Sequence, residues 1–241
     1  MNLLLLRPEQ LTSDSRARVQ GRQLRHMLDV HGAGIGDSLR VGLVNDAIGS
    51  AVVADLTDTE ASLEITWQED PPAPLPLTLV LALPRPKMLR RIIQSGVAMG
   101  VKRLVIVNSY RVDKSYWQTP WLGDEALAEQ ITLGLEQARD TLWPEIIQRK
   151  RFKPFVEDEL AAMTEGSRRL IAHPGSATAC PQGLTEPVSL CIGPEGGFIP
   201  YEVNLIREQG FEAVHLGPRI LRTETAIPAI LGRLFDIINL T

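Results

Sequence analysis

Two glycine-bearing turns in the last third of the chain are the residues most suited to binding a ligand. The first, "GPEGG" (193–197), follows the apolar run "VSLCI", and the second, "GPRILRTETA" (217–226), follows "AVHL". Gly193, Gly196 and Gly197 allow backbone conformations and close approaches that side chains would block. Such loops bind through backbone N–H and C=O groups, which suits the edge of a purine ring or a ribose.

Phosphate is a poorer candidate for these turns. No lysine–serine pair follows the glycines, and their spacing is not GxGxxG, so neither a P-loop nor a dinucleotide fingerprint is present. Composition alone leaves a plainer interpretation open, in which both segments are ordinary strand-to-helix turns.

The elements that must position the turns alternate between strand and helix after residue 76. Apolar runs predict strands at 77–83, 103–109, 145–148, 169–173, 188–192 and 213–217. Between and after them, helices are predicted at 86–100 (with Gly100 as the C′ residue), 124–140, 157–163 and 200–210, with a last helix through 229–238. This alternation indicates an α/β domain with a mainly parallel sheet. Because ligands bind beyond the carboxyl ends of parallel strands, both turns, with "AHPGS" (172–176), are expected at one edge.

A smaller unit precedes a proline-rich boundary, "QEDPPAPLP" (68–76), which reads as an extended linker. The opening ten residues predict a strand, residues 15–30 a helix with its arginines exposed, and residues 38–44, 49–57 and 61–67 short strands. Together they suggest a small β-barrel. The predicted organisation is a barrel domain over 1–70, a linker over 71–76 and the α/β domain over 77–241.

Composition limits the functional classes. The 241 residues are 44% hydrophobic and 22% charged, which is ordinary for a globular protein. No run of about 18 apolar residues predicts a membrane span, and the two cysteines, Cys180 and Cys191, form no CxxC or Cys/His cluster, so neither a metal site nor a redox site is expected. A reducing cytoplasm is the expected location.

The net charge of −4 gives no global attraction to nucleic acid, but local basic clusters stand out. Each cluster alone is compatible with a solvated face, whereas three clusters on different segments favour a converging phosphate-binding surface. The clusters are Arg16, Arg18, Arg22 and Arg25; Arg85, Lys87, Arg90 and Arg91; and Arg149, Lys150, Arg151 and Lys153.

The stretch "IGPEGGF" (192–198), the segment that follows it up to "EQGF" (208–211), and "LGPRILRTETA" (216–226) resemble the signature of the RsmE family, the 16S rRNA uridine-N3 methyltransferases of the SPOUT superfamily. Weaker similarity extends to "EQARDTLWPEI" (136–146), "GRQLRHML" (21–28) and "GDSLRV" (36–41). The resemblance covers most of the chain, although only the C-terminal forty residues or so are highly specific.

This resemblance implies an N-terminal PUA-like, RNA-binding β-barrel and a SPOUT-type α/β domain with a deep trefoil knot and helices on both faces of the sheet. It also implies a homodimer that methylates N3 of a uridine in the 16S rRNA of the small ribosomal subunit, with S-adenosylmethionine held in the knot loops. The residues expected to bind this cofactor are His173, Pro174, Ile192, Gly193, Pro194, Glu195, Gly196, Gly197, Leu216, Gly217, Ile220, Leu221, Arg222, Thr223, Thr225 and Ala226.

Three residues are candidates for catalysis. Loss of the N3 proton leaves a uracil anion, which nearby donors or cations stabilise. Arg219 and Arg222 would supply them, and Glu195 would orient the substrate or assist proton removal. The RNA surface is expected at Arg16, Arg18, Arg22 and Arg25.

Each assignment has a structural alternative. Glu195 would also stabilise a helix N-terminus, Arg219 would also bind RNA phosphate, and Arg222 would also pair with Glu224. The threonines 223 and 225 are candidates for capping the last helix, and His173 for a pocket wall.

The sequence departs from the family pattern in several places. Ile199 replaces a helix-capping serine, and Pro228 replaces an ordinary helix former inside the last helix. His31 and Gly32 stand where leucine and arginine are usual, and "EQARD" lacks the usual serine–glycine after the glutamine. These departures keep two alternatives open: a SPOUT methyltransferase acting on another RNA, and an RNA-binding or ribosome-assembly protein without catalysis. A nucleotide-binding dehydrogenase or kinase would lack its required motifs.

Overall fold

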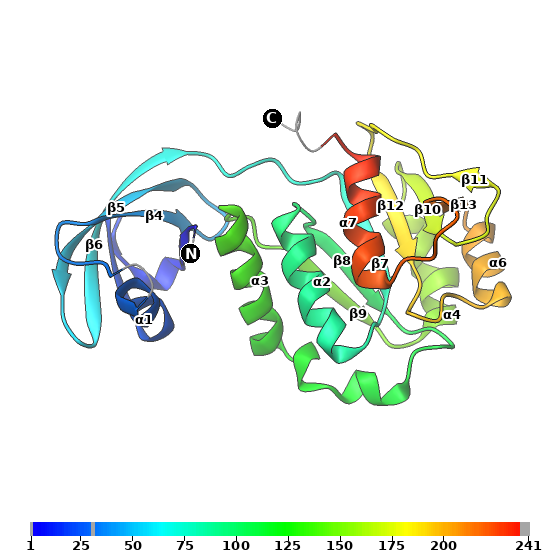
Figure 1. The fold of residues 1–241 in the computed structure, drawn as a ribbon, viewed down its shortest axis with the longest axis horizontal. Helices are drawn as coiled ribbons and strands as arrows, with labels where there is room; N and C mark the ends of the chain where they lie inside the picture. The colour runs from blue at the N-terminus through cyan, green and yellow to red at the C-terminus, as the bar shows by residue number, and fades with distance from the viewer. Residues whose placement is uncertain (1, 30–31, 237–241) are drawn as a thin grey trace. The chain divides into compact units, whose positions relative to one another are not determined.

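The chain divides into two compact units. The computed structural model describes residues 2–29 and 32–236. One unit comprises Met1–Pro72 together with Thr132–Trp143, and the other comprises Ala73–Ile131 and Pro144–Thr241 (Figure 1). The predicted division at residues 70 and 77 did not include this return of the chain to the first unit.

The first unit is built on a six-stranded sheet with the order β1-β4-β5-β6-β3-β2. Its neighbours are antiparallel except for the parallel pair β1–β4. Side chains such as Leu6, Val19, Met27, Val41 and Leu63 form its core. The elements are β1 (Leu4–Leu6), η1 (Pro8–Gln10), β2 (Leu11–Ser13), β3 (Arg16–Gln20), α1 (Gly21–Asp29), β4 (Ser38–Leu43), β5 (Ile48–Leu56) and β6 (Glu60–Glu69).

The helix predicted over residues 15–30 is wrong in its first part. Residues 16–20 form strand β3, in which Ala17 and Val19 are buried while the residues on either side of them are exposed. This alternation has the period of two that a half-buried strand requires. Gly21, with φ of +57°, turns the chain out of the strand, and the helix begins there. His31 lies outside the described residues.

The second unit contains a seven-stranded sheet with the order β11-β13-β10-β12-β7-β8-β9. Every neighbouring pair is parallel, as predicted. The predicted strands are present, and a two-residue edge strand, β11, adds to them. Their bounds are β7 (Leu77–Ala82), β8 (Arg103–Val107), β9 (Glu145–Arg149), β10 (Arg168–Ala172), β11 (Thr178–Ala179), β12 (Val188–Ile192) and β13 (Glu212–His215).

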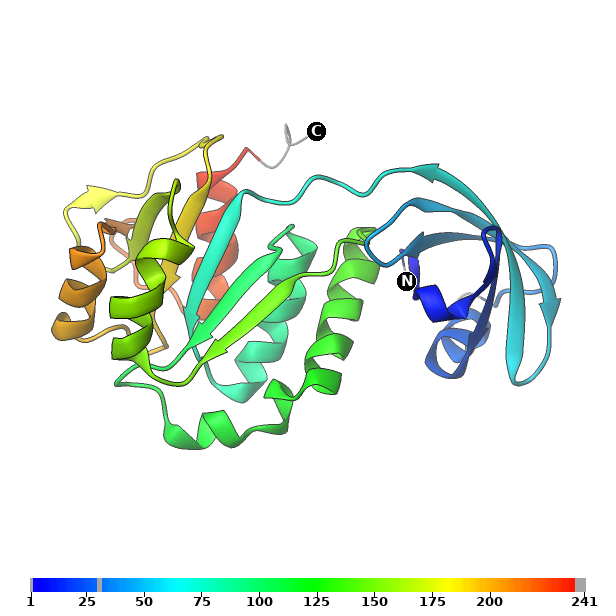
Figure 2. The same ribbon diagram turned by 180° about the vertical axis from the view of Figure 1, so that it is seen from behind.

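Helices cover both faces of this sheet. Helices α2 (Pro86–Ala98) and α7 (Thr223–Leu234) pack together on one face, and a helical segment over 152–163 lies with α6 (Pro200–Glu208) on the other (Figures 1 and 2). Gly100, with φ of +90°, donates its N–H to the C=O of Val97, as predicted for the C′ residue of α2. The remaining elements are η2 (Lys114–Gln118), η3 (Pro120–Leu122), α3 (Asp124–Ala138), α4 (Phe152–Pro154), η4 (Phe155–Leu160, a π-helix) and α5 (Ala161–Met163).

The last helix ends earlier than predicted. It ends at Leu234, whereas the sequence pattern extended it through residue 238; residues 237 and 238 lie outside the described part of the chain. No helix within the described ranges is long and apolar enough to cross a membrane.

Candidate ligand-binding site

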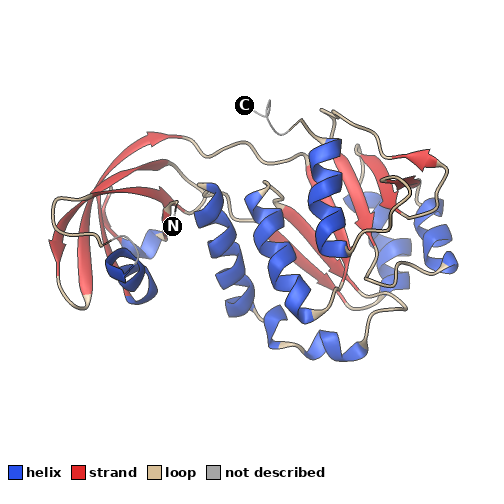
Figure 3. Ribbon diagram, viewed as in Figure 1, coloured by secondary structure: helices blue, strands red, loops and turns tan. Residues whose placement is uncertain are grey.

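The carboxyl ends of three adjacent strands, β10, β12 and β13, meet at one edge of the parallel sheet (Figure 3). Their ends lie in close register: Ala172 and Ile192, the last residues of β10 and β12, pair with each other, and Ala172 also pairs with Val214, the last residue but one of β13. The segments that leave these strands enclose a cavity of about 350 Å³. The sheet therefore brings together the turns that are separate in the sequence.

Most of the predicted cofactor-binding residues line this cavity; Arg222 and Thr225 do not. Of the predicted catalytic residues, Arg219 and Glu195 line it. Their roles stay predictions, because the structure gives their positions only. The predicted cofactor-binding residues that line it are His173, Pro174, Ile192, Gly193, Pro194, Glu195, Gly196, Gly197, Leu216, Gly217, Ile220, Leu221, Thr223 and Ala226.

The first turn is closed tightly on itself. The N–H of Gly197, whose φ is +70°, donates to the C=O of Pro194 at 2.7 Å. A Cβ atom on Gly193 would lie 2.8 Å from the backbone nitrogen of Phe198, a distance that real Cβ atoms do not tolerate. Residue 193 must therefore be glycine if the turn is to keep this shape.

The second turn is held by a histidine at the end of β13. Gly217, with φ of +111°, donates its N–H to Nδ1 of His215 at 2.9 Å. The residues that follow face solvent, with Ile220 82% exposed and Leu221 37% exposed. The turn therefore presents apolar side chains at the mouth of the cavity, where a bound ligand would cover them.

Helix α7 begins directly after this turn, with Arg222 as its N-cap residue and no side-chain cap. Capping by Thr223 or Thr225 is therefore not observed. No ion pair joins Arg222 to Glu224 in the described part of the chain. Because α7 starts at Thr223, Pro228 lies in its second turn, where it cannot donate to the C=O of Glu224.

The carboxylate of Glu195 is already engaged. Its Oε1 accepts the backbone N–H of Arg85 at 3.0 Å, and Arg85 is the residue that precedes α2. The helix N-terminus that Glu195 serves is thus that of α2, which supports the structural alternative for this residue. Glu195 is itself exposed.

Arg111 lines the cavity and was not predicted. Its guanidinium donates to the C=O of Gly196, and its Cδ would lie 3.0 Å from a Cβ atom on that glycine. Arg111 stands in "NSYRVDKS", just after β8. Since β8 is parallel to its neighbours, its carboxyl end belongs to the same edge, and this placement was the available signal.

Cys180 and Phe198 also line the cavity without having been predicted. Burial raises the pKa of the Cys180 thiol, and the positive charges of Arg233 and Arg168 oppose that shift. Arg233 also donates from Nε to the Cys180 carbonyl at 2.6 Å, which fixes this wall. Phe198 is buried and packs on Phe152, with ring centroids 5.9 Å apart.

Helix α6 begins without the serine that the family pattern would supply. Ile199 adopts the extended conformation of an N-cap but offers no acceptor. Glu202, which is 3% exposed, compensates in part, because its Oε2 accepts the N–H of Ile199 at 3.0 Å. Half of a capping box is therefore present.

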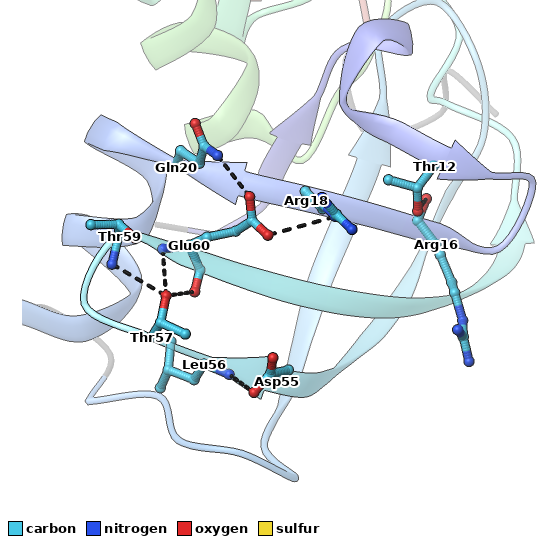
Figure 4. A network of polar contacts seen from close by, with 9 residues as sticks. All are labelled: Thr12, Arg16, Arg18, Gln20, Asp55, Leu56, Thr57, Thr59 and Glu60. Atoms are coloured by element: carbon cyan, nitrogen blue, oxygen red, sulfur yellow. Dashed lines mark hydrogen bonds and ion pairs between the residues drawn. The ribbon is translucent and has the colours of Figure 1, made fainter.

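The arginines predicted to bind RNA belong to the first unit and are mostly paired with glutamates. Arg16 contacts Glu64 at 2.6 Å. Arg18 lies 3.6 Å from Glu60, which also accepts a hydrogen bond from Gln20, as Figure 4 shows. Arg25 is exposed.

Arg22 is held more firmly than the other three. Its two terminal nitrogens donate to both carboxylate oxygens of Glu136, at 3.0 and 2.9 Å, and the Glu136 side chain is only 4% exposed. This geometry gives Arg22 a structural role within the first unit, and its RNA contact stays a prediction.

Comparison with known proteins identifies a family and several relatives. The family model for the RNA methyltransferase domain matches residues 71–235. The chain is 28% identical over 234 residues to ribosomal RNA small subunit methyltransferase E of Treponema pallidum (94% of this chain, 87% of that one), and 27% identical to the Synechocystis protein of the same name (96% and 76%). The structure is similar to that of the Neisseria gonorrhoeae protein of this name bound to S-adenosyl methionine, with a TM-score of 0.77, 24% identity, and coverage of 96% and 95% of the two chains.

Proposed function

The chain belongs to the RNA methyltransferase domain family through residues 71–235, and we propose that it transfers a methyl group from S-adenosylmethionine to N3 of a uridine in the 16S rRNA of the small ribosomal subunit. The observation that carries the proposal is the cavity formed by backbone turns at the ends of β10, β12 and β13. The names of the Treponema and Synechocystis relatives support the RNA substrate, and the ligand of the Neisseria structure supports the cofactor.

The cavity suits this cofactor in size and lining. Small-molecule sites are clefts of roughly 300 to 1,000 Å³ with mostly apolar walls and a few polar groups, and this cavity, at about 350 Å³, lies at the lower end. The turns 193–198 and 216–223 would hold the cofactor through backbone groups, beside His173 and Pro174. When bound, the cofactor supplies an electrophilic methyl group.

The chain's own residues would hold the uracil and stabilise its negative charge. Uracil N3 becomes nucleophilic when it loses its proton, so a nearby cation favours the reactive form. Arg219 is exposed and lines the cavity, and we assign this role to it first. Arg222, which precedes α7 and lies outside the lining, is the second candidate; Glu195 orients the first turn through Arg85.

Four further properties belong to the same proposal. The knot would be formed by α7. This helix follows β13 but packs on α2, and its end contacts the segment before β12, since the N–H of Leu184 donates to the C=O of Leu234 at 2.6 Å. The first unit would be the PUA-like barrel that binds RNA. The active form would be a homodimer, and the compartment would be the cytoplasm.

The test uses purified protein, methyl-labelled S-adenosylmethionine and small ribosomal subunits from a strain that lacks this protein. One methyl group per subunit, mapped by mass spectrometry to an N3-methyluridine, is the expected result. If label is absent while S-adenosylhomocysteine still binds in a parallel titration, the cofactor site stands and the 16S rRNA substrate is wrong. If S-adenosylhomocysteine does not bind either, the proposed function fails as a whole.

The catalytic assignment is tested by single-turnover rates. Arg219→Ala is expected to slow methyl transfer by about 100-fold, the loss typical of removing one donor to a developing anion, while S-adenosylhomocysteine affinity stays the same. Arg219→Lys should restore part of the rate because the positive charge remains. A rate unchanged in Arg219→Ala and lowered in Arg222→Ala would reverse the order of the two candidates.

A further inference from the structure

Two exposed tyrosines of the second unit are close in sequence to residues that line the cavity: Tyr110 precedes Arg111, and Tyr201 follows Phe198 by three residues. Tyr110 follows β8 and is 79% exposed, and Tyr201 is in the first turn of α6 and is 53% exposed. Within the described residues, neither ring has an aromatic or cationic partner. Exposed aromatic rings offer flat faces on which nucleic-acid bases can stack.

A buried carboxylate ties the backbones of these two tyrosines together. Oε1 of Glu202 accepts the N–H of Tyr110 at 2.7 Å, and Glu202 is the residue after Tyr201. Its other oxygen accepts the N–H of Ile199, so both oxygens of a side chain that is only 3% exposed are used for positioning. The two rings are therefore attached to a fixed backbone, which lowers the entropy cost of binding.

Arg111 connects the same loop to the cavity. It follows Tyr110, donates to the C=O of Gly196 and lines the cavity wall. A ligand group that enters the cavity would therefore have its neighbouring groups close to the tyrosines.

Positive charge continues along this edge of the sheet. The N–H of Asn108 donates to the C=O of Arg149 at 3.0 Å, so the chain that leaves β8 runs beside the chain that leaves β9. The residues that follow are Lys150 and Arg151, both exposed, and Lys150 lies 6.0 Å from the ring of Trp117. Exposed rings interleaved with cations are what single-stranded nucleic acid requires, since bases stack on aromatic faces while phosphates meet cations.

We propose that Tyr110 and Tyr201 form a platform on which bases flanking the target nucleotide stack, with Lys150 and Arg151 binding the adjoining phosphates of single-stranded RNA. This inference rests on the proposed function, because it takes the nucleotide in the cavity to be part of an RNA strand. Duplex RNA keeps its bases stacked on one another and offers the platform no free base face.

The experiment compares full-length Tyr110→Ala, Tyr201→Ala and the double variant with Tyr110→Phe and Tyr201→Phe, which keep the ring. The probe is a fluorescein-labelled oligouridine of about 10 nucleotides, read by anisotropy. Each alanine is expected to weaken binding by about tenfold, as loss of one base–aromatic stack does, and each phenylalanine should bind like the wild type. S-adenosylhomocysteine affinity is the control for folding, and the same length of duplex RNA is the control for base exposure.

Salt dependence separates the two parts of the surface. Lys150→Ala and Arg151→Ala should each lower the slope of log Kd against log salt by about 0.7, as expected for single strands, whereas the tyrosine variants should leave the slope unchanged. Alanine variants that bind oligouridine like the wild type overturn the platform. An equal loss of affinity for duplex RNA also overturns it. A loss of affinity that accompanies a change of oligomeric state in sedimentation overturns it too, because the tyrosines would then be a contact between copies of the chain. If the wild type methylates nothing yet its RNA binding depends on both rings, the platform stands and the proposed function falls.

Discussion

At the scale of single residues, the site depends on positions where a side chain cannot be added. Gly193 and Gly196 belong to the same turn but differ in what surrounds them. A Cβ atom on Gly193 would meet backbone atoms of Gly197 and Phe198, whereas one on Gly196 would meet the flexible stem of Arg111. Backbone atoms can give way only if the turn itself moves, while a long side chain can move aside on its own.

Substitution by alanine should therefore separate the two glycines. Gly193→Ala is expected to weaken S-adenosylhomocysteine binding by more than tenfold, which corresponds to more than about 1.4 kcal/mol, because the turn must open. Gly196→Ala should weaken binding by about threefold or less, because only the Arg111 side chain has to move. Isothermal titration of both variants measures this. Equal affinities would contradict the idea that turn shape at residue 193 controls the cavity.

The site residues that could be predicted from the sequence are those whose type implies a backbone geometry. The two turns were recognised because glycines after apolar runs indicate strand-end loops, and the parallel sheet then placed them at one edge. Arg111 was missed because its segment carries no glycine, and nothing in its own sequence marks the contact with Gly196. Contacts made by long side chains across strands are decided by packing and leave no local pattern.

At the scale of elements, the helices show how the fold accommodates residues that do not favour it. Helix α6 starts without a capping side chain and relies on Glu202. Helix α7 includes Pro228 in its second turn, which leaves the C=O of Glu224 without its usual donor. Burial of Ile227, Ile230, Leu231 and Leu234 stabilises α7 despite that loss.

Replacing the proline should therefore stabilise the protein. Pro228→Ala restores the N–H that can donate to the C=O of Glu224, so we expect a gain of about 2 kcal/mol in the free energy of unfolding. This is somewhat below the full cost of a proline inside a helix, because this helix has already adapted to its proline. Urea denaturation with the midpoint and slope both fitted measures it. Ala229→Pro, one residue further into the helix, is the opposite control and should destabilise. A loss of stability in Pro228→Ala would mean that the ring contributes more by packing than it costs in hydrogen bonding.

Element boundaries also show where a sequence pattern misleads. The pattern of residues 15–30 favours a helix with its arginines on the exposed side, yet Ala17 and Val19 alternate with polar neighbours as a strand requires. Gly21, at positive φ, was the signal for the boundary. The main strands of the second unit were predicted because each is a continuous apolar run, whereas β11, η2 and η3 have no such pattern.

At the scale of the whole molecule, the first unit contains a segment from the middle of the sequence. Residues 132–143 pack with residues 1–72. The N–H of Asn45 donates to the C=O of Thr141 at 2.9 Å, Oδ1 of Asn45 accepts the N–H of Trp143 at 2.7 Å, and the guanidinium of Arg7 lies 5.0 Å from the centre of the Trp143 ring. No composition shift or motif in the sequence marks this return, so a division at the proline-rich stretch could not include it.

The pair of Arg22 with Glu136 should contribute to stability through this arrangement. Arg22→Ala leaves a buried carboxylate without its partner, and we expect a loss of about 2 kcal/mol in the free energy of unfolding, less than for a fully buried pair because Arg22 is 43% exposed. Arg18→Ala removes a longer contact whose arginine is 62% exposed and should change stability by about 0.5 kcal/mol or less. Chemical denaturation of both variants and of Arg22→Ala with Glu136→Ala completes the comparison.

A similar loss of unfolding free energy in Arg22→Ala and Arg18→Ala would show that burial of Glu136 does not matter. The same measurement affects how RNA binding is tested, because a variant that replaces Arg16, Arg18 and Arg22 together would lose stability as well as charge. Arg16→Ala with Arg18→Ala, which leaves the pair of Arg22 intact, is the cleaner test of the predicted RNA surface.

The returning segment also sets an order of events during synthesis. A ribosome that has translated the first 72 residues has produced every strand of the six-stranded sheet but not Glu136, Thr141 or Trp143. Until about 70 more residues have emerged, the nascent chain holds Arg22 without its carboxylate and Asn45 without its backbone partners. The amino-terminal unit is therefore the first to begin folding, but it can be completed only after β7 and β8, the first two strands of the other sheet, have also left the exit tunnel.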